Sequence, residues 1–565
     1  MKKLMLVLLA CISLIQTEAQ YPIQNRKAAA HKQPAAPVPP AVEAPILKES
    51  LGRPKLVVGI MVDQMRWDYL YRFYDRFGAN GFKRMMREGS NCDQTMIPYA
   101  QTVTAVGHSS VYTGSVPALH GIMGNEWFDR KTGESVYCTD DSTVSLVGVE
   151  KGEPMSPANL WANTICDELR LATNFQSKVI GIAMKDRGGI LPAGHMANAA
   201  YWYDGVSGSW ITSTYYMKQL PDWVQAFNQK KWPDSFYVKD WNTLYPIETY
   251  TQSDADNVPY EGKFAYETAP VFPHELKSRL GKDYGAIRVT PYGSTLTLQF
   301  AKEAMQSEGL GADAITDFLA VSLSSPDYIG HQFGPNSIEI EDNYLRLDQD
   351  LADFYAYLDQ KVGKGQYTVF LTADHAVAHV PAFLEAHKYP AKSLTSSVAD
   401  LNKKAEEKFK LKQIIQASAN YQLYLNDTLL ANHKADVEAI RAFLIKELMQ
   451  LPDILIAFDC RKINDANLPA SVREMFVKGY NTKRAGDIQF VLKSGNFYGA
   501  KTGTTHGSYN PYDAHIPLLF MGWGIRPGVV RREVYMTDIA VTLASLLHIQ
   551  MPNAAIGHVI PEVIQ

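Results

Sequence analysis

Four continuous apolar runs along the chain predict the buried strands of a mostly parallel sheet. The first is KLVVGIMVDQM, after Pro54, and three similar runs follow far downstream: AITDFLAVSLSS, QYTVFLTADH and HIPLLFMGWG. Runs of β-branched and large apolar residues are typical of strands that are covered on both faces. Stretches with helical spacing separate them, for example 298–305 and 437–448. This alternation predicts an α/β layered fold.

Two long segments interrupt the alternation, and we expect them to be insertions. The first, about 201–292, is rich in Tyr, Trp and Pro, has weak periodicity and is expected to roof the site. The second, about 382–497, predicts a small α+β lobe. Its elements are a first helix, then strand QLYLN, helix KADVEAIRAFLIKEL, strand ILIAFDC, helix SVREMFV and strand DIQFVLK. A last helix, TDIAVTLASLLH, is expected to begin with Thr537 as its cap.

The N-terminal residues have the pattern of an export signal. Two lysines precede a short apolar run and the small-residue site TEA, so we expect a signal peptide over 1–19. The alternative is a lipoprotein box, LLAC, with Cys11 acylated; its early position and the apolar ISLI after it favour the signal peptide. A Pro/Ala-rich tether is expected over 20–53, before a folded region over 54–565. No later stretch is long and apolar enough to span a membrane, so the mature protein is expected in the periplasm or outside the cell.

Composition narrows the possible partners. A chain of 565 residues with 46% hydrophobic content can bury a large core. Its formal net charge of -4 provides no extended basic surface, so a nucleic-acid partner is not expected. Four cysteines follow the signal peptide in an oxidising compartment, and a bridge between Cys92 and Cys138 is the pairing we expect. Buried free thiols are the alternative. A thiolate zinc site is not expected, because the sequence has no CxxC pattern.

Acidic and imidazole side chains come directly after or before the apolar runs. The carboxyl ends of parallel strands gather ligand-binding groups at one edge of a sheet. Any one of these residues alone is typical of a cap or a packed side chain, but together they are ligand types that suit zinc. Two divalent ions would polarise a phosphoryl group. The candidate ligands are Asp63, Asp327, His331, Asp374, His375 and His506.

Thr104 is a candidate nucleophile in the segment PYAQTVTAVGHSSVYTG. It precedes a predicted short helix, whose N-terminus and a nearby cation would favour an alkoxide and a bound phosphate. Its local sequence alone would fit a simple N-cap. His515 is a weaker candidate ligand, and His108 and His379 are expected to be supporting or structural residues.

Six motifs in order resemble the alkaline phosphatase superfamily, most closely its PafA-type, phosphate-irrepressible bacterial alkaline phosphatases. They are GIMVDQMRWDYL, TVTAVGHSSVYTGSVPALHGIMGNEW, AMKDRGG, SSPDYIGHQFGP, LTADH and GTTHGSYNPYDAHIP. The resemblance covers the chain from Pro54 to its C-terminus. It implies a three-layer α/β/α sandwich with a mostly parallel central sheet and inserted cap lobes, two Zn²⁺ ions, and hydrolysis of phosphate monoesters.

The same resemblance implies a role for each candidate residue. Thr104 would attack phosphorus to form a phosphothreonine, which an activated water then hydrolyses. Asn125, Lys185 and Arg187 match residues that contact the non-bridging phosphoryl oxygens. The ligands of one zinc would be Asp327, His331 and His506, and those of the other Asp63, Asp374, His375 and the Thr104 oxygen.

Lys185 and Arg187 also have a direct physical interpretation. A guanidinium fork and an ammonium favour the dianionic monoester over a singly charged diester. Considered by itself, the segment also fits a solvated loop with Asp186 as ionic partner.

The alternatives to a monoester phosphatase are a phosphodiesterase or nucleotide pyrophosphatase of the same superfamily and an exported, non-catalytic binding protein. A sulfatase is excluded by Thr104, because that reaction needs Cys or Ser as the nucleophile precursor. Small-molecule phosphate monoesters and a monomeric protein are expected.

Overall fold

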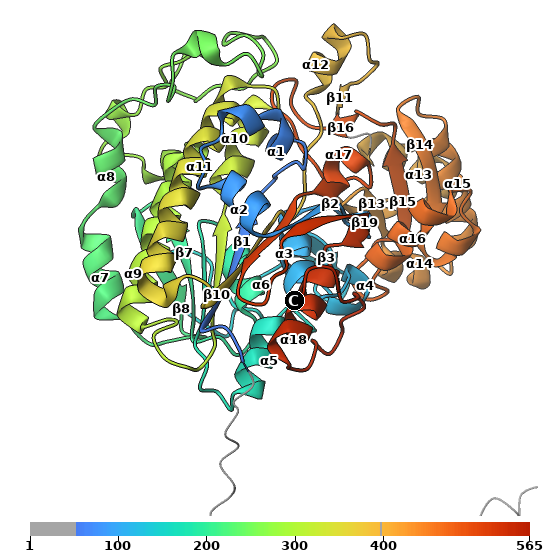
Figure 1. Ribbon diagram of the computed structural model, residues 1–565. Coiled ribbons are helices and arrows are strands. Elements are labelled where there is room, and N and C mark those ends of the chain that lie inside the picture. Colours follow the sequence, from blue (N-terminus) through green and yellow to red (C-terminus); the bar gives the residue numbers. More distant parts are fainter. Residues whose placement is uncertain (1–51, 396–397) are drawn as a thin grey trace, which may run out of the picture. The chain divides into compact units, whose positions relative to one another are not determined.

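A central sheet of 11 strands organises residues 52–395 and 398–565, the part of the chain that this computed structural model describes (Figure 1). The predicted signal peptide, Cys11 and the predicted tether up to residue 51 lie outside the described residues. The strand order is β17-β2-β18-β10-β1-β9-β6-β7-β8-β5, and β19 pairs with β2. The strands are β1 (Leu56–Val62), β2 (Ser90–Met96), β5 (Leu146–Val147), β6 (Val179–Ala183), β7 (Ala199–Asp204), β8 (Ser209–Ser213), β9 (Asp317–Leu323), β10 (Tyr367–Thr372), β17 (His515–Ile516), β18 (Leu518–Gly522) and β19 (Gly528–Tyr535).

The middle of the sheet is parallel, as the apolar runs predict. Strands β10, β1, β9, β6 and β7 are parallel neighbours, and every residue of β1 is buried. The fourth apolar run, β18, is instead antiparallel to β10. The chain passes through the whole second insertion between these two strands, so no single crossover helix sets their relative direction.

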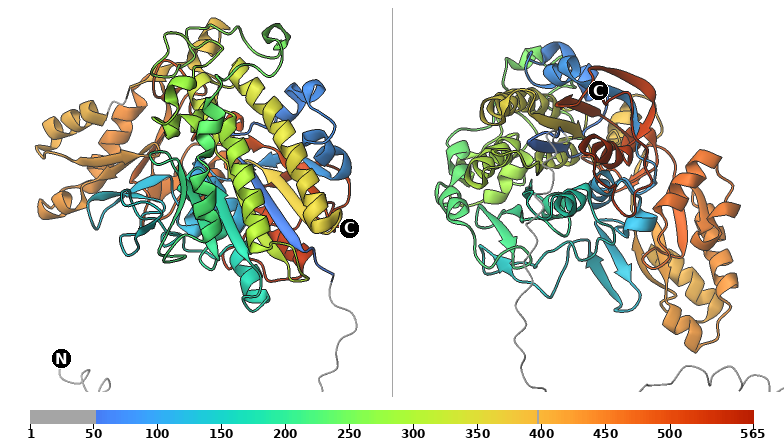
Figure 2. Two further views of the ribbon diagram at one scale, coloured as in Figure 1. Left: turned by 90° about the vertical axis from the view of Figure 1, so that its left-hand side faces the viewer. Right: turned by 60° about the horizontal axis from the view of Figure 1, so that its bottom comes forward.

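Two groups of helices cover the sheet and make a three-layer α/β/α arrangement (Figures 1 and 2). Within each group the helices pack on one another. One group contains α3 (Thr104–Thr113), α5 (Ile165–Ala172), α6 (Asp186–Ala193) and α18 (Asp538–Leu547). The other contains α2 (Phe82–Glu88), α9 (Tyr292–Glu308), α10 (Ser325–Phe333) and α11 (Ile338–Leu358). None of the helices in the described ranges has both the length and the apolar character of a membrane span.

The prediction that Thr537 caps α18 is right about the position and wrong about the hydrogen bond. Thr537 occupies the N-cap position, but its side chain makes no capping hydrogen bond. Its backbone already has helical angles, whereas a capping side chain reaches back from an extended backbone. Helix α5 shows the expected geometry, since Thr164 and Asp167 form a complete capping box.

The first insertion begins later than the sequence suggests, because its first residues form β7 and β8 in the central sheet. After β8 the chain forms α7 (Asp222–Gln229) and α8 (Trp232–Tyr237), which pack against α9. Further along, Gly262 N donates to Gln332 O at 2.7 Å, and Gly503 N donates to Tyr260 O at 2.9 Å. This part of the insertion therefore contacts the segments next to His331 and His506.

The second insertion contains a separate four-stranded sheet, in the order β12-β13-β15-β14, with its own apolar cluster. The predicted elements appear as β13 (Gln422–Leu425), α15 (Val437–Met449), β14 (Ile454–Asp459), α16 (Ala470–Gly479) and β15 (Ile488–Leu492). Strand β12 (Ile415–Ala419) was not predicted, because IQASA carries only one large apolar residue. Arg130 joins this lobe to the core through Asp487, with an Nη2 to Oδ2 distance of 2.7 Å.

The predicted disulfide between Cys92 and Cys138 is wrong. Both cysteines are buried free thiols, as are Cys166 and Cys460. Burial raises the pKa of the Cys92 thiol to about 12, so this side chain packs as a neutral apolar group. Cysteine spacing by itself could not distinguish this outcome from a bridge.

Candidate active site

The candidate ligands meet at one edge of the central sheet. Strands β10, β1 and β9 are adjacent and parallel, so their carboxyl ends lie side by side. Asp63 follows β1, Asp374 and His375 follow β10, and Asp327 lies in the first turn of α10, just after β9. His506 joins them from the loop after the second insertion. The structure thus brings together all six predicted ligands, in two groups.

The first group consists of Asp327, His331 and His506. Asp327 and His331 are four residues apart on α10, so both project from the same face of that helix. Asp327 Oδ1 is 3.2 Å from His331 Nε2 and 3.6 Å from His506 Nε2. The two Nε2 atoms are themselves 3.2 Å apart. Two ring nitrogens and a carboxylate oxygen therefore converge on one point.

The second group consists of Asp63, Asp374 and His375, all fully buried. His375 Nε2 is 3.6 Å from Asp63 Oδ1 and 3.4 Å from Asp374 Oδ2. Thr104 Oγ1 lies 3.5 Å from the same Nε2 atom. The rings of His375 and His506 stack with centroids 3.5 Å apart, so the two groups are immediate neighbours.

Three buried carboxylates and the histidine tautomers fit a pair of divalent cations. The Nδ1 atoms of His331, His375 and His506 each lie 2.7 to 3.0 Å from a backbone carbonyl oxygen. A carbonyl only accepts, so each Nδ1 carries the proton and each Nε2 presents a lone pair. Within the described part of the chain, Asp63 Oδ1 and Asp374 Oδ2 are buried without a hydrogen-bond partner. Such orphaned carboxylate oxygens are costly unless a cation compensates them.

The surroundings of each site residue shift its pKa and so determine whether its side chain is neutral or charged. Burial, and then repulsion from Asp374, raises the pKa of Asp63 well above its usual value. Burial acts in the same direction on Asp327, but the neighbouring His331 and Lys185 hold the pKa of its carboxyl well below the usual range. Burial and the neighbouring His375 lower the pKa of His506, which keeps the ring neutral and able to bind a cation.

Thr104 is the first residue of α3, and Val103 occupies the N-cap position. The alternative of Thr104 as a simple N-cap is therefore wrong. Gly107 lets this helix approach the ligands closely, because a Cβ at that position would lie 2.2 Å from Asp374 O. His108 supports the same turn: its Nδ1 bonds Thr104 O at 2.9 Å and lies 3.4 Å from Asp374 Oδ2, and its Nε2 bonds Ser322 Oγ at 2.8 Å.

Two of the three predicted phosphoryl contacts, Lys185 and Asn125, lie next to Thr104 or to the residue after it. Lys185 Nζ is 2.7 Å from Asp63 Oδ2, 2.5 Å from Asp327 Oδ2 and 3.5 Å from Thr104 Oγ1. Burial lowers the pKa of Lys185, but the two carboxylates outweigh it and raise the pKa, so the ammonium stays charged. Asn125 Oδ1 accepts from Ala105 N at 2.9 Å, and its Nδ2 has no hydrogen-bond partner among the described residues.

Arg187 forms no ion pair with Asp186, contrary to the interpretation of this segment as a solvated loop. The Asp186 carboxylate accepts from Tyr137 Oη at 3.0 Å and from Thr139 Oγ1 at 2.6 Å. Arg187 Nη1 donates to Tyr137 Oη at 2.7 Å, and Arg187 forms no ion pair within the described ranges. An available guanidinium therefore lies in the same turn as Lys185.

Gln64 is a supporting residue that sequence reasoning missed. Its Nε2 donates to Asp327 Oδ1 at 2.7 Å and its backbone N donates to Asp374 Oδ1 at 3.1 Å, so it contacts both ligand groups. Its φ of 67° lies in the left-handed region, which is unfavourable for a residue with a side chain. No local sequence pattern predicts this backbone strain. The sequence signal for Gln64 is its position directly after the predicted ligand Asp63.

The other candidate histidines lie outside the two ligand groups. His515 stacks on Trp67 with ring centroids 4.5 Å apart, and its Nε2 bonds Asp93 O at 2.9 Å. His379 bonds Asn336 Oδ1 through Nδ1 at 2.6 Å. Both are structural in this fold.

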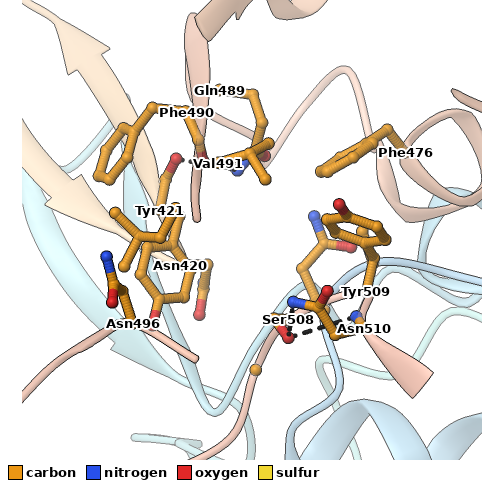
Figure 3. A pocket seen from close by; sticks show the side chains of 14 residues that line it. Asn420, Tyr421, Phe476, Gln489, Phe490, Val491, Asn496, Ser508, Tyr509 and Asn510 are labelled. Carbon is orange, nitrogen blue, oxygen red and sulfur yellow. Dashed lines mark hydrogen bonds between the residues drawn. The ribbon is translucent and has the colours of Figure 1, made fainter. Parts of the chain in front are cut away.

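A pocket lies beside the loop that follows His506, where the second insertion meets the core (Figure 3). Tyr421 and Phe490 line one side and Tyr509 another, and Asn510 Nδ2 donates to Ser508 Oγ at 3.0 Å. Its volume is about 30 Å³. A space of this size holds one or a few water molecules.

Comparison with known proteins connects this geometry to a family. The family model described as type I phosphodiesterase / nucleotide pyrophosphatase matches residues 57–515. A Myroides odoratus protein named calcium-transporting ATPase is 52% identical, over 92% of this chain and 97% of its own. The alkaline phosphatase PhoV of Synechococcus elongatus is 50% identical, over 93% of this chain and 95% of its own. The crystal structure of the alkaline phosphatase PafA matches with a TM-score of 0.90 and 50% identity, over 92% of this chain and 100% of that one.

These similarities extend over nearly the whole chain and include its fold. They confirm the predicted alkaline-phosphatase-like α/β fold and the resemblance to the PafA type. The chain is a phosphatase enzyme, which sets aside the non-catalytic alternative. It therefore belongs to the type I phosphodiesterase / nucleotide pyrophosphatase family of the alkaline phosphatase superfamily, and within it to the PafA-type alkaline phosphatases.

Proposed function

We propose that this phosphatase hydrolyses phosphate monoesters through a covalent phosphothreonine at Thr104, in a site for two zinc ions. One observation carries the proposal: Thr104 Oγ1 lies 3.5 Å from both His375 Nε2 and Lys185 Nζ. A hydroxyl at a helix N-terminus, between a group of candidate ligands and a charged lysine, is in the position that an attacking oxygen needs.

The donor set supports zinc as the metal, because neutral imidazoles and carboxylates together suit this ion. Bound zinc would supply positive charge that polarises the phosphoryl group and lowers the pKa of a hydroxyl or water. One ion would be held by Asp327, His331 and His506, and the other by Asp63, Asp374, His375 and the Thr104 oxygen.

The proposed reaction has two steps, and each forms one bond to phosphorus and breaks another. Thr104 Oγ1 forms a bond to phosphorus while the phosphorus–oxygen bond to the alcohol breaks and the alcohol leaves. A water molecule then attacks the phosphothreonine, which releases inorganic phosphate and restores the hydroxyl. Lys185, Arg187 and the Asn125 amide would donate to the non-bridging oxygens and hold the phosphoryl group in line.

The second candidate is a phosphodiesterase or nucleotide pyrophosphatase activity, which the description of the matching family model favours. A monoester dianion carries one more negative charge than a diester. Lys185 places a cationic side chain 3.5 Å from Thr104 Oγ1, and Arg187, two residues further along, has no carboxylate at ion-pair distance in the described part of the chain. That excess of positive charge supports the monoester as the better substrate.

Export through the N-terminal signal, a monomeric state and the absence of a nucleic-acid partner stay predictions from the sequence. Small-molecule phosphate monoesters remain the expected substrates.

The test compares kcat/KM for an aryl phosphate monoester, a matched diester and a matched sulfate, with and without added zinc. We expect the monoester to be strongly preferred. Thr104→Ala should lower monoester turnover at least about 10³-fold while the protein keeps its zinc, because only the nucleophile is lost. Thr104→Ser, which retains a hydroxyl, is the matched control and should keep most of the activity.

An acid quench during turnover should trap phosphate on the peptide that contains Thr104, detected by mass spectrometry. Unchanged turnover in Thr104→Ala would remove this residue from the mechanism. A diester preference in the zinc-loaded wild type would support the second candidate instead.

A further inference from the structure

A second cavity, of about 200 Å³, lies next to the proposed phosphoryl contacts. It opens at the carboxyl ends of β6 and β7, on the same sheet edge as the candidate ligands. Lys185 and Arg187 form part of its wall, and so does Tyr328, the residue after Asp327. The cavity therefore adjoins the position where the substrate phosphoryl group would bind, and it is several times larger than the pocket of Figure 3.

Two arginines in this wall lack an ionic partner. The Nε atoms of Arg187 and Arg288 are buried without a hydrogen-bond partner among the residues that the structure describes. Arg288 Nη2 donates to Tyr203 O at 2.5 Å, and its guanidinium lies over the Tyr203 ring at 5.5 Å. Neither arginine forms an ion pair with any carboxylate of the described chain. A half-buried guanidinium without a counter-ion is costly, and it is a ready site for an anion.

The carboxylates around the cavity form no ion pair with either arginine within the described ranges, and only Asp186 lies close enough to Arg187 to raise the pKa of its guanidinium. Asp186 accepts hydrogen bonds from Tyr137 and Thr139, and Asp204 accepts from the backbone N of Ser207 at 2.7 Å. Glu153 also lines the cavity, but it is solvent-exposed, where water screens its charge. The Arg288 guanidinium has no carboxylate at ion-pair distance among the described residues, so its positive charge points to a ligand rather than to a structural ion pair.

We propose that this cavity binds a second anionic group, a carboxylate or a second phosphate, carried on the alcohol part of the monoester substrate, with Arg288 as the residue that recognises it. The proposal rests on the monoester hydrolysis proposed above. Lys185 connects the two places, since it lines the cavity and its Nζ lies 3.5 Å from Thr104 Oγ1. Trp202 and Tyr203 supply an apolar wall for the carbon chain between the two anionic groups.

The test uses two series of alkyl phosphates of increasing chain length, one ending in a carboxylate and one in a neutral hydroxyl. For each length, the ratio of the two kcat/KM values isolates the effect of the second charge. In the wild type this ratio should rise to a maximum at one chain length, where the carboxylate reaches Arg288. Arg288→Met should lower the maximum about tenfold, the expected loss of one charge-assisted hydrogen bond. Arg288→Lys, which restores the charge, should recover part of it.

Lys282→Met is the matched control, because it removes the same charge from the same insertion at an exposed position that does not line the cavity. It should leave the ratio as in the wild type. A ratio that does not depend on chain length, or that Arg288→Met and Lys282→Met lower equally, would overturn the proposal.

Inhibition of the enzyme by free inorganic phosphate is a further measurement that tests the proposal. If the cavity served free phosphate instead of a substrate group, Arg288→Met would weaken that inhibition without changing the carboxylate ratio, which would also overturn the proposal. Turnover of the hydroxyl series tests the proposed function separately. If no monoester were hydrolysed by the zinc-loaded wild type, the proposed function would fail rather than this inference alone.

Discussion

Lys185 and Arg187 are two residues apart, but the fold neutralises their charges differently. Lys185 contacts two buried carboxylates, whereas Arg187 donates to the Tyr137 hydroxyl and forms no ion pair within the described ranges. The lysine therefore helps to hold the ligand groups together, and the guanidinium keeps its capacity to bind an anion. Both would act on the phosphoryl oxygens, with Arg187 contributing the more specific geometry.

At this scale we predict that replacing Lys185 and Arg187 together by Ala changes substrate preference. Monoester kcat/KM should fall by about 10² to 10³, since two charge-assisted contacts to the dianion are lost. The loss for a diester, with a single negative charge, should be about tenfold or less. Steady-state kinetics on a matched pair of aryl esters measures both. Lys218→Ala, at an exposed position, is the control for charge alone, and equal losses on the two esters would contradict the prediction.

Helix α3 positions Thr104 at the scale of a single element. Its N-terminus faces the ligand groups, and Gly107 permits contact between the helix and the backbone of Asp374. The closeness of this contact explains why a residue with no functional side chain lies one turn from the proposed nucleophile. Helix α10 contributes in a different way, because its i to i+4 spacing presents Asp327 and His331 together.

Gly107→Ala should therefore displace α3 or the turn at Asp374. The added Cβ would lie 2.2 Å from a carbonyl oxygen, and overpacking of this kind costs about 1–3 kcal/mol of stability. We expect activity to fall at least tenfold with a measurable drop in melting temperature, and circular dichroism should show a retained fold. Ser109→Ala is the matched control on the same helix, because the Ser109 hydroxyl has no hydrogen-bond partner in the described ranges. Wild-type kinetics in Gly107→Ala would show that the helix has room there.

At the scale of the whole molecule, buried ionic contacts join the first insertion to the core. His274 lies in that insertion, and its two ring nitrogens contact Glu267 and, on α11, Glu339, the latter at 3.0 Å. Burial lowers the pKa of His274, but these hydrogen bonds outweigh it and raise the pKa to about 9. Burial and the nearby Glu339 raise the pKa of Glu261 to about 10, so this carboxyl is protonated at neutral pH.

We predict that His274 makes stability fall at alkaline pH. Its raised pKa means that its contribution is fully present below about 6.5 and is lost as the pH rises through about 9. The contribution is on the order of 3 kcal/mol. Glu261 acts in the same direction, because its carboxyl also binds a proton more tightly in the folded state. Urea unfolding from pH 6 to pH 10, for the wild type and His274→Gln, isolates the histidine.

The difference in unfolding free energy between these two proteins should shrink as the pH rises. A difference that stays constant across this range would show that the histidine does not titrate in the folded protein.

Removal of the metal ions tests both groups of candidate ligands at the same time. Ions that bind only the folded state stabilise it by about 3–4 kcal/mol when present at 100 to 1,000 times their dissociation constant. Chelation should therefore lower the melting temperature and abolish activity, and added zinc should restore both. Thr104→Ala should keep the thermal shift and Asp327→Asn should lose most of it. Identical melting with and without chelator would contradict a folded-state metal site.

Much of this organisation was predictable from the sequence. The apolar runs predicted the parallel strands, because burial on both faces leaves a continuous hydrophobic signature. The residues at the ends of those runs predicted the ligand set, since parallel strands end at a common edge. The roles of Asn125, Lys185 and Arg187 depended on the family resemblance, because their local segment fits an ordinary loop equally well.

Only the tertiary structure decided the features that depend on contacts between distant segments. The four cysteines are free because each is buried in its own surroundings, which cysteine spacing does not encode. The left-handed backbone of Gln64, the two arginines that face one cavity and the antiparallel direction of β18 are likewise invisible in the local pattern. Local sequence determines which elements form and which chemical groups end them. Packing of segments hundreds of residues apart determines which of those groups keep their charges free for a substrate.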